Sequence, residues 1–294
     1  MKFLSFVSQA FLAMLLLTES ASAQRVKNRL YDSAQNKSDW RIGLRYTSDY
    51  YYMGRADSAK APYLSPSIGY FHESGFFLAG SLSYLTSPEE QRVDLIRLSA
   101  GYDYYNKNLV TGISLTEYFF SDLSFAVQAE MSTYLNAYAG YDFSVAMLYV
   151  DGGLGFSEGT DVFLGVEVNH TFYAWKDRIR IIPSLYLNAG SQKYYNEYYA
   201  WRSEHTGAGM GHGHGGANHQ ASQSDLRIEE YDEFKILDYE ADVYVAYKTQ
   251  KFLFFIAPTW TFPINPSTVT TNNGSYKEEL KNGFYWSCGI RLTL

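Results

Sequence analysis

From residue 40 onward, apolar and polar residues alternate in short segments that are separated by turn-forming residues. Successive side chains of a β-strand point to opposite faces, so such a segment predicts a strand with one apolar and one polar face. In residues 40–47, Trp40 and Ile42 fall on the apolar face, whereas Arg41 and Arg45 fall on the polar face. We predict twelve such strands, in residues 40–47, 63–71, 76–85, 93–104, 109–119, 132–143, 147–156, 162–173, 179–192, 234–248, 252–262 and 283–294.

The connections between these segments alternate in length. Those after even-numbered strands are short, and the longest ones follow odd-numbered strands, in residues 48–62, 120–131, 193–233 and 263–282. An even number of strands, with short turns at one end and longer loops at the other, is typical of bacterial transmembrane β-barrels. Pro66, Pro183 and Pro258 fall inside predicted strands, and we expect β-bulges there because proline cannot donate to the ladder.

Composition agrees with a protein that crosses a membrane through its strands. Aromatic residues make up 18% of the chain, and aromatic girdles mark both interfaces of membrane barrels. The longest apolar run after residue 23, in residues 252–257, is far shorter than the roughly 20 residues that a membrane helix needs. A net charge of -7 argues against nucleic acid as a partner. We therefore predict an all-β fold, a transmembrane antiparallel up-and-down β-barrel, with a secreted β-sandwich as the alternative.

The beginning of the chain predicts export. Lys2 precedes a long apolar run, and a small-residue cleavage site that ends at Ala23 follows it. This is the pattern of a secretory signal peptide that is removed before folding. The predicted organisation is a signal peptide in residues 1–23, a periplasmic lead-in in residues 24–39 and the barrel in residues 40–294.

The last predicted strand carries a family resemblance. Residues 284–294 read F-Y-W-S-C-G-I-R-L-T-L, and the only cysteine, Cys288, falls on the apolar face that would contact lipid. This strand resembles the closing strand of Gram-negative outer-membrane β-barrels, which also acts as an assembly signal, although that signal usually ends in an aromatic residue rather than Leu294. The many tyrosines are similar to those of barrels from Bacteroidetes. The resemblance implies an outer-membrane location, contact with outer-membrane lipid and recognition by the barrel-assembly machinery, and it identifies no functional residue.

Alternation places charges of both signs inside the barrel. The predicted lumen-lining residues are Arg41, Arg45, Arg97, Arg180, Asp238, Glu240, Asp242 and Arg291, with Asp103, Asp142, Asp151 and Glu167 as further inward carboxylates. Twelve strands lie between the roughly 8 that side chains can fill and the 16–18 of open porins. Two hypotheses follow: a narrow channel for small solutes or ions, or a closed structural barrel that acts through its outer loops. Three carboxylates on one face of residues 234–248 predict a preference for cations if solutes pass.

The longest outer connection, in residues 193–233, is rich in glycine and histidine. Its candidate metal ligands are His205, Met210, His212, His214 and His219. Imidazole binds Zn, Cu or Ni, and thioether favours Cu(I), so a metal site is one hypothesis. The spacing lacks the ligand geometry of a structural zinc site, and a low-complexity surface loop without a ligand is the alternative.

Catalytic motifs are weak in this sequence. There is no Gly-x-Ser-x-Gly, and outside the glycine-rich connection no histidine lies beside a plausible nucleophilic serine. His170 falls on the lipid face of its strand, where it could not serve a triad. We therefore predict a protein that is not an enzyme, and an outer-membrane phospholipase or protease is the less favoured alternative.

Overall fold

The computed structural model describes residues 37–57, 59–198, 227–229, 232–271 and 274–294. The predicted signal peptide, most of the predicted lead-in and the five candidate metal ligands lie outside the described residues. Those predictions therefore remain predictions.

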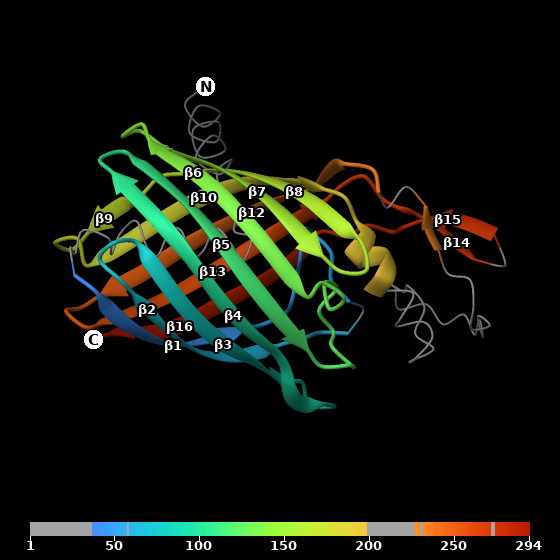
Figure 1. The fold of residues 1–294 in the computed structure, drawn as a ribbon, viewed down its shortest axis with the longest axis horizontal. Helices are drawn as coiled ribbons and strands as arrows, with labels where there is room; N and C mark the ends of the chain where they lie inside the picture. The colour runs from blue at the N-terminus through green and yellow to red at the C-terminus, as the bar shows by residue number, and fades with distance from the viewer. Residues whose placement is uncertain (1–36, 58, 199–226, 230–231, 272–273) are drawn as a thin grey trace, which may run out of the picture.

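Twelve long strands form one closed antiparallel barrel (Figure 1). They are β1 (Asp39–Thr47), β2 (Tyr63–Phe71), β3 (Phe76–Thr86), β4 (Gln91–Asn106), β5 (Leu109–Phe120), β6 (Thr133–Asp142), β7 (Met147–Phe156), β8 (Thr160–Asn169), β10 (Ile179–Gly190), β12 (Lys235–Lys248), β13 (Phe252–Pro263) and β16 (Gly283–Thr293). Each strand pairs with the next along the chain, and β16 pairs with β1 to close the sheet. The predicted fold class and strand count are confirmed.

Small elements complete the fold at the two ends of the barrel. At the short-turn end, β9 (Phe172–Ala174) continues the line of β8 along β10. At the loop end, β11 (Arg227–Glu229), β14 (Thr268–Thr271) and β15 (Gly274–Lys277) form a separate three-stranded sheet. Residues 193–198 are helical and lie at the same end (Figure 1). The longer connections thus carry structure of their own.

The outer surface of the barrel is apolar along the strands. Exposed residues of this belt include Trp40, Ile42, Leu44, Ile68, Leu78, Leu98, Ile113, Leu115, Phe254, Ile256 and Phe284. Near the short turns, aromatic rings pair on the outside, as in Trp40 with Tyr70 and Trp175 with Tyr247. A sheet that closes on itself satisfies its backbone hydrogen bonds without water, so such a belt suits hydrocarbon. No helix within the described ranges is long and apolar enough to span a membrane.

The predicted bulges at the three prolines are wrong. The pairing register stays constant at Pro66, Pro183 and Pro258, so no residue is inserted there. The β8–β9 line instead breaks opposite Pro183, because proline has no N–H for a ladder hydrogen bond. The register shifts elsewhere, and the extra residues are Asp94 in β4 and Leu237 in β12. Both lie near the loop end of the barrel.

Candidate functional site

One wall of the lumen carries arginine and serine side chains from five neighbouring strands, β16, β1, β2, β3 and β4. A row of directly opposed residues crosses this wall at mid-height, in the order Arg291, Gly43, Ser67, Ser81 and Arg97. Adjacent strands lie about 4.8 Å apart, so roughly 19 Å of sheet separates the two arginine positions. We define the arginine–serine wall as Arg41, Arg45, Arg97, Arg291, Ser65, Ser67, Ser81, Ser83 and Ser99.

Another part of the lumen is acidic. The acidic wall consists of Asp151 in β7, Glu167 in β8, and Asp238, Glu240 and Asp242 in β12. Glu167, Asp238, Glu240 and Asp242 are buried, and two of them make short hydrogen bonds within the barrel. Asn188 Nδ2 donates to Asp238 Oδ1 at 2.8 Å, and Asn169 Nδ2 donates to Glu167 Oε1 at 2.6 Å. Side chains therefore fill this half of the lumen, as the closed-barrel hypothesis expects.

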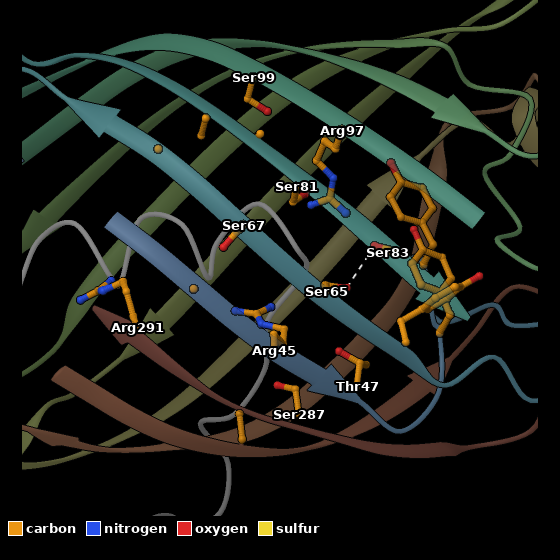
Figure 2. Close-up of a pocket in the computed structure, with 18 of the residues that line it drawn as sticks. Arg45, Thr47, Ser65, Ser67, Ser81, Ser83, Arg97, Ser99, Ser287 and Arg291 are labelled. Carbon is orange, nitrogen blue, oxygen red and sulfur yellow. Dashed lines mark hydrogen bonds between the residues drawn. The ribbon is translucent and has the colours of Figure 1, made fainter. Parts of the chain in front are cut away.

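A cavity of about 320 Å³ lies against the arginine–serine wall (Figure 2). Along β1 it runs from Arg41, near the short-turn end, to Thr47, the last residue of the strand. Glu240 and Asp242 contribute to its lining from the acidic wall. Basic and acidic side chains thus border the same space from different strands, and the volume is within the range of small-molecule sites.

The loop end of the cavity is covered by the connection in residues 48–62, which folds back over the barrel mouth. Its tip is a two-residue turn, Met53 (φ 48) and Gly54 (φ 76), closed by hydrogen bonds between Tyr52 and Arg55. Two successive residues with positive φ define a type I′ turn, which favours glycine. A Cβ on Gly54 would lie 2.7 Å from Asp238 Cβ, so the tip touches the acidic wall directly.

Arg55 joins this turn to the rest of the loop end. Its guanidinium donates to the carbonyl oxygens of Met53 (3.2 Å), Leu237 (2.7 Å), Ile264 (3.3 Å) and Asn265 (3.3 Å). It also lies 3.6 Å from a carboxylate oxygen of Glu278, and it is 1% exposed. A planar guanidinium with five donors can connect several acceptors at once. One side chain therefore ties two connections, in residues 48–62 and 263–282, to strand β12.

The two bulge residues serve as further attachment points. Asp94 accepts hydrogen bonds from Ser121 Oγ at 2.7 Å, from Ser124 Oγ at 2.8 Å and from Tyr63. The Leu237 carbonyl accepts from Ile264 N at 2.9 Å as well as from Arg55. A bulge re-aims the inserted residue out of the regular ladder. Both insertions thus hold the outer connections in place.

An aromatic cluster fills the space beneath these connections. It contains Met53, Val127, Met131, Tyr134, Phe163, Tyr194, Tyr195, Tyr198 and Leu237, none more than 7% exposed. Asp161 positions the helical residues, because its carboxylate accepts from the backbone N–H groups of Lys193 and Tyr194 at 2.8 Å each. Tyr198 Oη in turn donates to Asp57 Oδ2 at 2.6 Å. We call the aromatic cluster together with residues 48–57 the plug.

Two carboxyl groups at the plug are destabilised as anions. Burial raises the pKa of Glu197 above its ordinary value, although the N–H of Gly159 donates to the carboxylate at 3.3 Å. Burial also raises the pKa of Asp49, although its carboxylate accepts from the N–H groups of Tyr50 and Ala61 at 2.9 Å each. Proton binding to either group therefore favours the packed plug.

Six of the eight predicted lumen-lining residues border the cavity: Arg41, Arg45, Arg97, Glu240, Asp242 and Arg291. The other two lie away from it. Asp238 is fully buried between Asn188 and Thr261, and the Arg180 guanidinium lies 5.9 Å from the ring of Tyr173. Arg41 is held by Asp39, with two hydrogen bonds of 2.8 and 2.9 Å. The predicted site residues thus differ in their access to solutes.

Neither Arg55 nor the plug was predicted from the sequence. The available signal was the run Tyr50, Tyr51, Tyr52 and Met53 inside a connection that was expected to face water. Four successive large apolar or aromatic residues in a loop indicate that the loop packs against another surface of the protein. Here the surface is the barrel mouth.

Several solved structures of outer-membrane barrels are similar to this chain in fold. No protein-family model matches the sequence, and no curated protein is similar to it. Among solved structures, the KdgM porin is 10% identical with a TM-score of 0.47, covering 86% of this chain and 98% of that one. The NanC porin is 9% identical with a TM-score of 0.47, covering 87% and 100%, and an outer-membrane channel from Pseudomonas putida F1 is 10% identical with a TM-score of 0.44, covering 87% and 95%. Because the identities are this low and the TM-scores are below 0.5, these structures show nothing about the function of this chain.

Proposed function

We propose that the protein is a narrow channel for small polar solutes in the outer membrane of a Gram-negative bacterium. The observation that carries this proposal is the 320 Å³ cavity, which follows β1 along almost its whole length and is lined by ionic and hydroxyl groups. A barrel whose only task is mechanical has no need of a cavity beside four arginines. Export by the predicted signal peptide and recognition of the last strand by the assembly machinery belong to the same proposal.

In this proposal the structure is the closed state of the channel. The plug covers the loop end of the cavity through packed side chains and hydrogen bonds, and passage requires residues 48–57 to leave the mouth. Among the described residues, the connections at the opposite end of the barrel are short turns. Lids of this kind move on microsecond to millisecond timescales, so openings should appear as discrete events.

Charge placement bears on ion preference. The sequence predicts a preference for cations from Asp238, Glu240 and Asp242, but Asp238 does not border the cavity. The cavity faces arginines on β16, β1 and β4 and carboxylates on β12, so both ion signs meet a favourable wall. We therefore expect weak selectivity among simple ions and a stronger selection for polar solutes that fit between the walls.

The second candidate is a closed barrel that acts through its outer loops, and the densely packed plug favours it. Planar-bilayer recording on refolded protein separates the two functions. Discrete conductance steps that become larger or more frequent in an Arg55→Ala variant support the channel. A silent bilayer with both the parent and the Arg55→Ala protein, each shown to be inserted by heat-modifiable gel mobility, rejects the channel and leaves the closed barrel.

A further inference from the structure

Arg97 differs from the other charged residues of the cavity in its surroundings. Among the described residues no carboxylate pairs with its guanidinium, and its Nε has no hydrogen-bond acceptor. The guanidinium lies 5.7 Å from the centre of the Tyr118 ring, which supports the charged plane from one side. Arg41, in contrast, is already neutralised by Asp39 through two hydrogen bonds. Arg97 is therefore a fixed positive charge that is available to a solute.

Two serine hydroxyls extend from this charge across the wall. Ser81 lies directly opposite Arg97, and Ser67 lies directly opposite Ser81, so the two are roughly 5 and 10 Å of sheet away from Arg97. Neither hydroxyl makes a hydrogen bond to another described residue, and both border the cavity. Figure 2 shows Arg97, Ser81 and Ser67 in sequence along the wall, with Arg45 further on.

Room for a ligand at this row comes from glycine. Gly43 follows Ser67 in the row, and a Cβ there would lie 2.7 Å from Ser67 Oγ. Any larger residue would therefore displace the hydroxyl from its present position. Tyr50 and Tyr52 of the plug border the same cavity at the loop end. The Arg97 end of the row thus presents one cation and two hydroxyls to a space that aromatic rings of the plug close at the loop end.

We propose that Arg97, Ser81 and Ser67 form a binding site for an oxyanion carried by a polyhydroxylated small molecule, such as a sugar acid. The planar guanidinium donates two parallel hydrogen bonds to a carboxylate, and the serine hydroxyls form hydrogen bonds with hydroxyl groups on the neighbouring carbon atoms of the ligand. Simple anions lack the hydroxyls and neutral sugars lack the charge, so each uses half of the site. This site would define the class of solute that the proposed channel takes, so its biological role rests on the proposed channel function.

Calorimetric titration of the full-length protein in detergent micelles tests the site directly. The probes are D-glucuronate, with D-glucose and acetate as the two halves, and D-glucose 6-phosphate to show which oxyanion binds better. Glucuronate or the sugar phosphate should bind at least tenfold more tightly than glucose or acetate. Titrations on the parent and on the Arg55→Ala protein are both needed, because the plug covers one end of the cavity. Absence of binding in both proteins, or equal affinity for glucose, overturns the site.

Variants assign the binding to these residues. Arg97→Gln should weaken the binding of the anionic sugar at least tenfold, and the pair Ser67→Ala and Ser81→Ala should weaken it several-fold while leaving acetate unchanged. The matched control is Arg178→Gln, which makes the same change at an exposed arginine of a short turn that does not border the cavity. It should bind as the parent does. Unchanged affinity in a folded Arg97→Gln protein rejects the site.

Failure of the site and failure of the channel give different results. If the protein conducts but Arg97→Gln does not change its affinity for glucuronate, the binding site is rejected and the channel stands. Binding that depends on Arg97 in a protein that never conducts rejects the channel and leaves the site, as the pocket of a closed barrel.

Discussion

The guanidinium of Arg55 donates a 2.7 Å hydrogen bond to the backbone carbonyl of Leu237, 182 residues further along the chain. Leu237 is the extra residue of a β-bulge, so its carbonyl is available for this contact. The first outer connection of the barrel is thus fastened to one of its last strands. Fastening at this point holds the plug over the cavity.

Replacement of Arg55 by alanine should release the plug and leave the barrel intact. The change removes four hydrogen bonds to carbonyl groups and the contact with Glu278. Removal of one partner from a buried ionic network costs about 3–5 kcal/mol, and here that cost falls on the plug because the strand ladder does not involve the side chain. Single-channel recording should show a higher open fraction, and heat-modifiable mobility should be unchanged.

The control for this change is Lys60→Ala in the same connection. Lys60 is exposed and its removal should leave the open fraction as it is. Equal gating in the Arg55→Ala and Lys60→Ala proteins would show that Arg55 does not fasten the plug.

Gly54→Ala should loosen the plug by a different route. Gly54 has a φ of 76°, and a Cβ there would press on Asp238 and Pro263. Left-handed backbone alone costs an L-residue about 1–2 kcal/mol, and the overlap adds to this. Limited proteolysis of the micellar protein should cut within residues 48–62 faster than in the parent. Gly159→Ala is the matched change, since the nearest atoms to a Cβ there belong to the flexible side chains of Lys193 and Glu197. Faster cutting in that variant as well would contradict the assignment.

The strands were predictable from the sequence because each one repeats the same local pattern of alternating apolar and polar residues. Lipid requires an apolar residue at every second position, and Trp40, Ile42 and Leu44 meet that need without reference to other parts of the chain. The inward direction of Arg97 follows from the same alternation. The plug was not predictable in this way, because the Arg55–Leu237 contact joins a connection to a strand that lies 182 residues further along the chain. The predicted positions of the β-bulges were wrong as well. The bulges occur at Asp94 and Leu237, which hold the outer connections, and not at the prolines.

Asp161→Ala should destabilise the helical residues beside the plug. The carboxylate accepts from Ser191 Oγ at 2.6 Å and from two backbone N–H groups at the start of the helix. Loss of such a cap costs about 0.5–2 kcal/mol. Hydrogen exchange of the amides in residues 193–198 should become faster by the corresponding factor. Asp161→Asn keeps one of the two acceptor oxygens, so it loses only part of the cap and should accelerate exchange less than Asp161→Ala does. Equal acceleration in both variants would show that the charge, and not the cap, matters.

Acid should favour the closed plug. Burial raises the pKa of Glu197 above its ordinary value of 4.5, so the packed plug binds this proton more tightly than the released plug does. The stabilising contribution is fully present below pH 4.5 and is lost as the pH rises through the raised pKa. Asp49 acts in the same direction because burial also raises its pKa. The open fraction of single channels should therefore fall as the pH is lowered from neutral, and Glu197→Gln, which stays uncharged at every pH, should reduce this dependence. An open fraction that rises on acidification would contradict the proposed role of these carboxyl groups.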